Sequence, residues 1–218
     1  SVPLQEVILH SDAPYCLYVP GRFACFSPER FVRIADGRIS TNPMKGTIDA
    51  SIPDAAQAIL ADPKETAEHY TVVDLLRNDL GMVAERVEVK RFRYIDTLRT
   101  NRGDILQVSS EIVGTLPEDS FSRMGDILFR MLPAGSVSGA PKRSTLELIR
   151  RAEERPRGFY TGVFGYFDGR ELDSAVMIRY IEQTDGGMCF RSGGGITVMS
   201  RPEEEYDEVL KKIYLPFL

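Results

Sequence analysis

The sequence predicts an α+β fold, with layered antiparallel or mixed β-sheets and helices packed outside them. Stretches with apolar residues at every second position, typical of strands, are interleaved with stretches of helical periodicity. Asp-Gly and Gly-Gly pairs join several strand-like stretches, and such pairs favour tight hairpins. Because the strands and helices follow no regular alternation, we predict an α+β arrangement with antiparallel pairing.

The individual elements can be assigned from these patterns. The predicted strands are FACFSP (23–28), FVRIAD (31–36), ERVEVKRF (85–92), DILQVSSEIVGTL (104–116), GVFGYF (162–167), SAVMIRYIE (174–182) and MCFRSGGGIT (188–197). The predicted helices cover about residues 53–61, 63–79, 120–131, 141–154 and 203–214, and prolines 63, 141 and 202 mark three of the starts. Residues 1–20 have no clear periodicity. Because the chain opens with Ser1 rather than methionine, we expect residues 1–218 to be a single domain from a longer protein.

Composition favours a soluble globular protein and argues against two kinds of partner. The 218 residues are 43% hydrophobic and 27% charged, enough to bury the core of one domain. The net charge of -5 and the scattered arginines argue against nucleic acid, because binding phosphates takes clustered Lys and Arg. No apolar run is long enough for a membrane span and no signal sequence opens the chain, so we expect a cytoplasmic protein. Cys16, Cys25 and Cys189 lack CxxC spacing and are expected to be core thiols.

The stretch SPERFVRIADGRISTNPMKGT, residues 27 to 47, predicts a hairpin that brings an acid and an amine together. A two-residue turn at Asp36-Gly37 places Glu29 opposite Met44 and therefore beside Lys45. The pair is either a surface ion pair or an acid and a nucleophile or base at one site. For Lys45 to attack a substrate near pH 7 it must be neutral, which means a pKa roughly three units below ~10.4.

Two pairs of glutamates suggest a metal. Glu65 and Glu68 lie in PKETAEHYTVVDLL, and Glu205 and Glu208 lie in RPEEEYDEVLKKI. Within each pair the three-residue spacing stacks both carboxylates on one face near a helix start. Acids at such positions also cap helices and suit the helix dipole, so either pair alone has an ordinary explanation. Two facing helices with four carboxylates would repel each other unless a cation lay between them, and hard oxygen ligands suit Mg²⁺.

Glycine-rich loops and an arginine suggest a binding site for an anion. PAGSVSGAPK (133–142) leads into a predicted helix, so it is either an anion site built from free backbone N–H groups or an ordinary capped loop. The three glycines of RSGGGIT allow close approach of a ligand or form a simple turn. A turn at Asp168-Gly169 pairs Tyr160 with Met177 and brings Tyr160 near Arg179, whose guanidinium suits a carboxylate. Together these features predict a Mg²⁺-dependent enzyme for a small anionic substrate.

Eight motifs in order resemble those of the chorismate-utilising enzymes: SPERF, NPMKGT, AEHYTVVDLLRNDLG, GSVSGAPK, GFYTGVFGYF, IRYI, SGGGIT and EEEYDEVLKKI. This family includes the first components of anthranilate synthase and aminodeoxychorismate synthase, and the isochorismate and salicylate synthases. The resemblance runs from about residue 26 to the end. Family chains are longer, so it implies the catalytic C-terminal portion of the fold, without the N-terminal part.

The resemblance also implies roles for the residues singled out above. Glu68 and Glu208 would bind Mg²⁺ directly, with Glu65 and Glu205 behind them through water, and the metal would hold a carboxylate of the chorismate dianion. The remaining substrate-binding residues implied by the resemblance are Arg179, Tyr160, Lys212, Ser136 and the backbone at Gly193, Gly195, Gly139 and Ala140.

Lys45 separates the branches of this family. Anthranilate synthases carry a small residue at this position, which leaves room for ammonia at ring carbon 2. In aminodeoxychorismate synthases a similar lysine is thought to attack carbon 2, while a glutamate like Glu29 protonates the departing carbon-4 hydroxyl and ammonia adds at carbon 4. Isochorismate and salicylate synthases use the lysine as a base that activates water.

The residues of these motifs are most similar to those of the aminodeoxychorismate synthase branch. That branch implies amination with ammonia from a glutamine amidotransferase subunit, on the route to 4-aminobenzoate and folate. Isochorismate, salicylate or anthranilate synthesis remains an alternative, and so does a chorismate-binding fragment without catalysis.

One position departs from the family pattern. Gln107 stands where many relatives have a histidine facing the ring, and glutamine does not carry a proton at neutral pH. The two histidines of the chain are poor substitutes. His69 is expected to orient or pack, and His10 lies outside the motifs.

Overall fold

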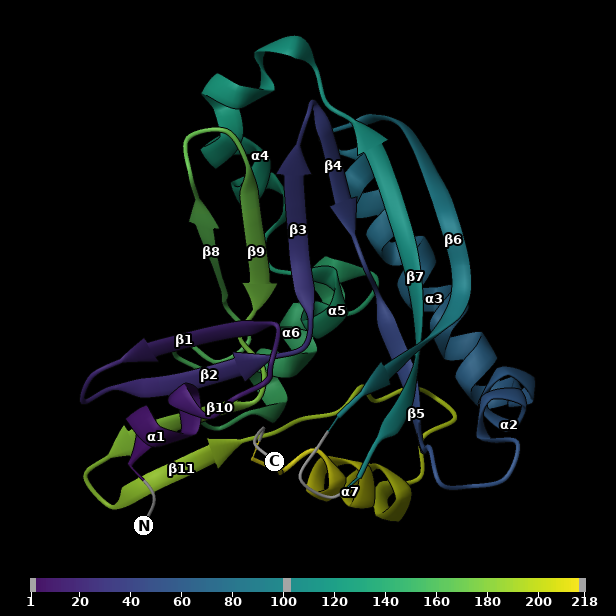
Figure 1. Ribbon diagram of the computed structural model, residues 1–218, viewed down its shortest axis with the longest axis vertical. Coiled ribbons are helices and arrows are strands. Elements are labelled where there is room, and N and C mark those ends of the chain that lie inside the picture. The colour runs from purple at the N-terminus through teal and green to yellow at the C-terminus, as the bar shows by residue number, and fades with distance from the viewer. Residues whose placement is uncertain (1–2, 100–102, 216–218) are drawn as a thin grey trace.

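The computed structural model describes residues 3–99 and 103–215; Ser1, where the expected domain begins, lies outside these ranges. It confirms an α+β fold built on two antiparallel sheets (Figure 1). The large sheet has seven strands in the order β5-β7-β4-β3-β9-β8, with β6 paired to β7 as well. The small sheet has four strands in the order β1-β2-β10-β11. In the part of the chain described, no helix is both long and apolar enough to cross a membrane.

The elements have the following bounds. The strands are β1 (Tyr15–Val19), β2 (Phe23–Ser27), β3 (Arg30–Ala35), β4 (Arg38–Thr41), β5 (Met44–Asp49), β6 (Glu85–Leu98), β7 (Ile105–Thr115), β8 (Val163–Phe167), β9 (Leu172–Val176), β10 (Tyr180–Thr184) and β11 (Gly187–Arg191). The helices are α1 (Leu4–Leu9), α2 (Ala55–Ala61), α3 (Pro63–Gly81), α4 (Met124–Met131), α5 (Gly135–Ser138), α6 (Lys142–Ala152) and α7 (Pro202–Lys211), with a 3₁₀ helix at Glu118–Arg123.

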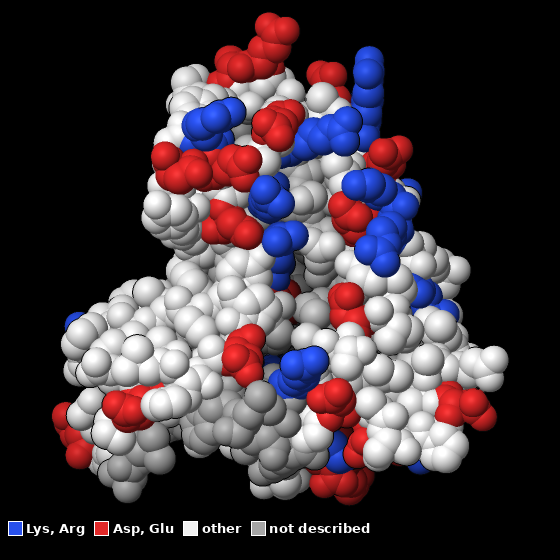
Figure 2. Space-filling view, in the orientation of Figure 1, with Lys and Arg blue, Asp and Glu red and all other residues white. Residues whose placement is uncertain are grey.

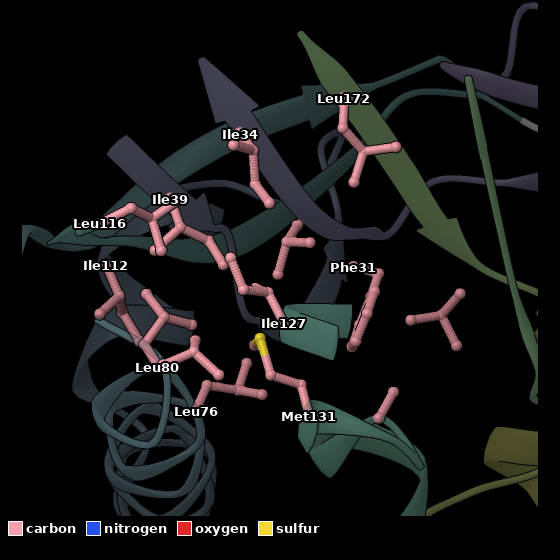
Figure 3. Close-up of a cluster of buried hydrophobic side chains, with 14 of the residues drawn as sticks. Phe31, Ile34, Ile39, Leu76, Leu80, Ile112, Leu116, Ile127, Met131 and Leu172 are labelled. Carbon is pink, nitrogen blue, oxygen red and sulfur yellow. The ribbon is translucent and has the colours of Figure 1, made fainter. Parts of the chain in front are cut away.

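Helices α3 and α4 cover one face of the large sheet (Figure 1). Val73, Leu76 and Leu80 form one stripe of α3, and Ile127 and Met131 come from α4. These side chains meet apolar residues of the sheet, among which Ile39 and Ile112 are fully buried (Figure 3). Burial of this apolar surface is the main force that fixes α3 against the strands.

The other face of the large sheet, turned to the viewer, carries interspersed charges of both signs (Figure 2). Two cross-strand ion pairs are Lys90–Glu111 and Arg30–Asp173, and Arg33 of β3 pairs with Glu171 in the loop before β9.

Several predicted elements need correction. The expected strand 174–182 is two strands in different sheets, because the chain leaves β9 at Val176 and enters β10 at Tyr180. The expected strand 188–197 ends at Arg191, and helix 120–131 is a 3₁₀ helix followed by α4. Residues without clear periodicity form α1 and β1, where Leu4 and Val7 of α1 pack on the small sheet. Of the cysteines only Cys25 is buried, since Cys16 and Cys189 are exposed, so the expectation of core thiols is wrong for those two.

Candidate active site

Two crossings between the sheets lie side by side and bring Glu29 and Arg179 together. Glu29 lies between β2 and β3, and Arg179 lies between β9 and β10. The crossings are hydrogen-bonded to each other, because Phe26 N donates to Arg179 O (3.1 Å) and Val176 N donates to Glu29 O (3.1 Å). Arg179 takes a positive φ of 54°, a conformation with a strain cost that a continuous strand would not need. The change of sheet is therefore what positions both side chains.

Glu29 has the surroundings of a proton donor. Its Oε1 accepts a short hydrogen bond from Ser136 Oγ at the start of α5. Burial raises the pKa of Glu29 above its usual value, although the Ser136 hydrogen bond and the charges of Arg179, Lys212 and Lys45 act to lower it. A carboxyl group with a raised pKa keeps its proton closer to neutral pH.

Lys45 does not lie in the register that the hairpin predicts. The turn pairs Ala35 with Arg38 as expected, but the β3–β4 ladder stops at Arg33–Ser40. From Met44 onward the chain pairs with β7 instead, so the predicted Glu29–Met44 pairing does not form.

The Lys45 amine is paired with a glutamate. Its Nζ lies 2.7 Å from Glu68 Oε2, and both side chains are largely buried. Burial alone would lower the pKa of Lys45, but the hydrogen bond and charge of Glu68, with further contributions from Glu208 and Glu65, raise it. A neutral amine, which nucleophilic attack by Lys45 requires, would therefore need this ion pair to open.

The four predicted metal ligands lie on α3 and α7, where Glu65 is within electrostatic reach of Glu68 and Glu208, and Lys64 of α3 contacts Glu205. Burial is the largest cause of the raised pKa of Glu65, and the negative charges of Glu68 and Glu208 raise it further. Glu205 is buried and accepts a hydrogen bond from Ser200 Oγ (2.6 Å). Glu208 Oε1 lies 2.5 Å from Lys212 Nζ, and the net effect of Lys212 and other nearby lysines is to lower the pKa of Glu208 despite its burial.

The donor chemistry of these four carboxylates fits Mg²⁺. All are hard oxygen donors, and glycines leave room beside two of them: a Cβ on Gly46 would lie 2.7 Å from Glu65 Oε2, and one on Gly194 3.6 Å from Glu205 Oε2. Among residues 3–99 and 103–215, however, no three acidic, His or Cys side chains stand in position to hold an ion. Glu68, Glu205 and Glu208 are each paired with a lysine.

The glycine loop before α7 lines the same site. A Cβ on Gly193 would lie 3.1 Å from Tyr160 Oη, and one on Gly195 3.7 Å from Lys45 Nζ. Lys212 Nζ also donates to Gly193 O (3.3 Å). A side chain at Gly193 would thus crowd Tyr160, whereas one at Gly195 would only reach van der Waals contact with Lys45.

The second hairpin forms with a longer loop than predicted. Phe167 pairs with Leu172, so four residues rather than two form the loop, and Tyr160 is not opposite Met177. The Asp168 carboxylate accepts hydrogen bonds from the N–H groups of Arg170 and Glu171, which stabilises the wider loop. Tyr160 nevertheless lies within electrostatic reach of Arg179, as predicted.

Two predicted positions, Gly139 and Ala140, lie in the connection between α5 and α6. A Cβ on Gly139 would contact Thr145 of α6. The helix there begins at Lys142, one residue after Pro141.

Two polar side chains, Gln107 and His69, lie in the large sheet and on the helix behind it. Gln107 lies on β7 opposite Thr47 of β5, and its buried Oε1 has no hydrogen-bond partner within the described chain. His69 is fully buried, and its Nε2 lies 2.7 Å from Ser110 Oγ. Burial lowers the pKa of His69 to about 4, so it packs in neutral form, as expected.

Sequence reasoning missed Lys64 and Ser200. Lys64 Nζ lies 3.6 Å from Glu205 Oε1, and Ser200 donates to the same oxygen. The signal for Lys64 was available, because it precedes Glu68 by four residues and so faces the same side of α3. Ser200 gave no such signal, since only the folded loop brings it to Glu205.

Comparison with known proteins identifies the family. Residues 4–216 match the family described as chorismate binding enzyme. The chain belongs to this family. Among solved structures, anthranilate synthase component I from Streptococcus pneumoniae superposes on the chain with a TM-score of 0.80 at 31% identity, over 96% of this chain and 47% of that one.

Two curated relatives are much more similar in sequence. An uncharacterized PabA-like protein of Pasteurella multocida is 57% identical over 98% of this chain and 66% of its own length. Another from Haemophilus influenzae is 54% identical over 99% of this chain and 66% of its own length. The chain thus spans about two thirds of the length of these relatives.

Proposed function

We propose that the protein aminates chorismate to 4-amino-4-deoxychorismate, with Mg²⁺ as cofactor, on the route to 4-aminobenzoate and folate. The observation that carries the proposal is one site in which Glu29, with its raised pKa, lies near Lys45, Arg179 and Lys212, and Lys45 lies near Glu65, Glu68 and Glu208. Membership of the chorismate binding enzyme family and the two PabA-like relatives support it. The expected compartment is the cytoplasm.

Each group has a role in this reaction. Glu29 gives its proton to the departing hydroxyl at ring carbon 4, which leaves as water, while Lys45 forms a bond to carbon 2. Ammonia then adds at carbon 4 and Lys45 is expelled. The ion pair between Lys45 and Glu68 has to open before the amine can lose its proton.

Binding of the dianion uses the surrounding groups. Arg179, Tyr160, Lys212 and the loop at Gly193 and Gly195 would hold the carboxylates, and Ser136 would keep Glu29 in place. Mg²⁺, held by Glu68 and Glu208 with Glu65 and Glu205 behind them, would supply the positive charge that lets a dianion enter an acidic site. Within the described part of the chain the sequence has no glutaminase signature, so the ammonia would come from a glutamine amidotransferase subunit.

The deciding experiment is product analysis with chorismate, Mg²⁺ and ammonium. We expect 4-amino-4-deoxychorismate, and intact-protein mass spectrometry should detect a transient adduct that Lys45→Ala abolishes. If isochorismate forms without ammonia, the reaction is the addition of water rather than ammonia, with Lys45 as the base. Chorismate binding without any product would leave only a binding fragment.

Anthranilate is the second candidate product, favoured by the superposition on anthranilate synthase component I. It requires ammonia to reach ring carbon 2, where the Lys45 side chain lies in our proposal. We therefore expect Lys45→Ala, rather than the unchanged protein, to accept ammonia at that carbon.

A further inference from the structure

Lys64 bridges the two helices that carry the glutamates. It lies in the first turn of α3, and its Nζ is 3.6 Å from Glu205 Oε1 on α7. Within the described chain this is the one ion pair that joins α3 directly to α7; Lys45–Glu68 links β5 to α3, and Lys212–Glu208 lies at the end of α7. Lys64 therefore sits where carboxylates from both helices approach each other.

The charge around Lys64 comes from both helices. Glu205 and Glu204 of α7, and Glu68 and Glu65 of α3, all lie within electrostatic reach of its amine. The three lysines at the cluster carry fewer charges than the four glutamates, so the cluster stays acidic as a whole. Removing any one lysine would leave a carboxylate without its counter-ion.

Lys64 is also the lysine best able to leave. Its side chain is 38% exposed, compared with 22% for Lys45 and 25% for Lys212. Its contact with Glu205 is the longest of the three, and it extends from the first turn of a helix toward solvent. Moving Lys64 into water costs less than moving the other two, because it gives up the weakest ion pair.

We propose that Lys64 is an internal counter-ion that holds α7 against α3 without a divalent cation and leaves Glu205 when the cation binds. Lys64 then sets the affinity for the cation by direct competition. The inference rests on the proposed Mg²⁺ site, and it assigns Lys64 no role in the chemical step.

The test is Mg²⁺ binding by isothermal titration calorimetry, without substrate, on the unchanged protein, Lys64→Met and Lys211→Met. Lys211 is an exposed lysine in the last turn of α7 and serves as the matched control. Lys64→Met should bind Mg²⁺ at least about fivefold more tightly, the lower end of usual coupling between two sites, while Lys211→Met changes little. An unchanged affinity for Lys64→Met overturns the proposal. Absence of Mg²⁺ binding by the unchanged protein overturns the proposed metal site itself.

Thermal unfolding distinguishes displacement of Lys64 by Mg²⁺ from simple repulsion of Mg²⁺ by the charge of a Lys64 that stays in place. In EDTA, Lys64→Met should unfold at a lower temperature than the unchanged protein, because Glu205 and its neighbours lose their counter-ion. In saturating Mg²⁺ the two should unfold at the same temperature, since Lys64 has already left Glu205. A difference that persists in Mg²⁺ means that Lys64 stays in place, and the proposal fails.

Discussion

At the scale of single residues, the site combines groups whose environments push them in opposite directions. Burial raises the pKa of Glu29, so this carboxyl is suited to giving a proton. Glu68 and its neighbours raise the pKa of Lys45, so this amine is held protonated until its partner is drawn away. An acid and an amine with separately set pKa values are what the proposed reaction needs.

Replacing Glu29 should abolish the acid without disturbing the fold. Glu29→Gln keeps the size of the side chain but has no proton to give, so we expect kcat to fall by roughly 10²- to 10⁴-fold. In the unchanged protein kcat/KM should fall as the pH rises through the raised pKa of Glu29, and this limb should vanish in the variant. Steady-state rates across pH provide the measurement. A rate within a fewfold of normal would remove Glu29 as the acid.

Replacing Glu208 should weaken the metal site far more than replacing a neighbour. Glu208→Gln removes a proposed direct ligand, so Mg²⁺ affinity should fall by about 100-fold or more. Glu204→Gln is the control, because Glu204 lies on the same helix, is 53% exposed and pairs with Arg201. Calorimetric titration of both variants checks this, and equal losses would mean that only the net charge of α7 matters.

At the scale of elements, α3 carries two proposed metal ligands near its start, and its C-terminal end contacts the short helix that holds the proposed acid, Glu29. Asp79, near the end of α3, accepts hydrogen bonds from Lys142 Nζ (3.0 Å to each carboxylate oxygen). A Cβ on Gly135 would lie 2.6 Å from Asp79 Oδ2, so α5 packs directly on this carboxylate. The next residue, Ser136, donates to Glu29. Asp79 thereby positions the short helix that holds the acid.

Removing Asp79 should destabilise the protein and lower activity together. Its side chain is 7% exposed and that of Lys142 22%, so Asp79→Ala leaves a largely buried cation unpaired and should cost about 3 kcal/mol of unfolding free energy. Asp74→Ala, on the same helix, breaks an exposed pair with Arg77 and should have little effect. Urea unfolding of both variants compares the two. Equal small effects would show that α5 is held by packing alone.

At the scale of the whole molecule, most local signals could be read from the sequence, whereas the choice of partner strand could not. The Asp36-Gly37 turn and the Ala35–Arg38 pair follow from neighbouring residues, as do the glutamate pairs on α3 and α7. The end of the β3–β4 ladder and the change of sheet at Arg179 depend on which strands compete for each edge. Periodicity carries no information about that competition, so the contacts of Glu29 and Lys45 could not be predicted.

The angle between the two sheets should therefore control the site, and Tyr15 is the residue that tests this. Tyr15 of β1 donates to Asp173 Oδ1 of β9 (3.0 Å), and Arg30 Nε donates to the Tyr15 hydroxyl (2.7 Å), so this hydroxyl ties the small sheet to the large one. Tyr15→Phe removes the tie at a cost of about 1 kcal/mol, which lowers the unfolding temperature by about 2–4 °C.

Because Glu29 and Arg179 sit at the crossings between the sheets, Tyr15→Phe should also raise KM for chorismate well below the unfolding temperature. Tyr166→Phe is the control, since Tyr166 is 75% exposed on the edge strand β8 and should change neither quantity. Calorimetric melting and steady-state kinetics on both variants check the two effects. A lower unfolding temperature with an unchanged KM would mean that the crossings hold Glu29 and Arg179 in place without help from the tie.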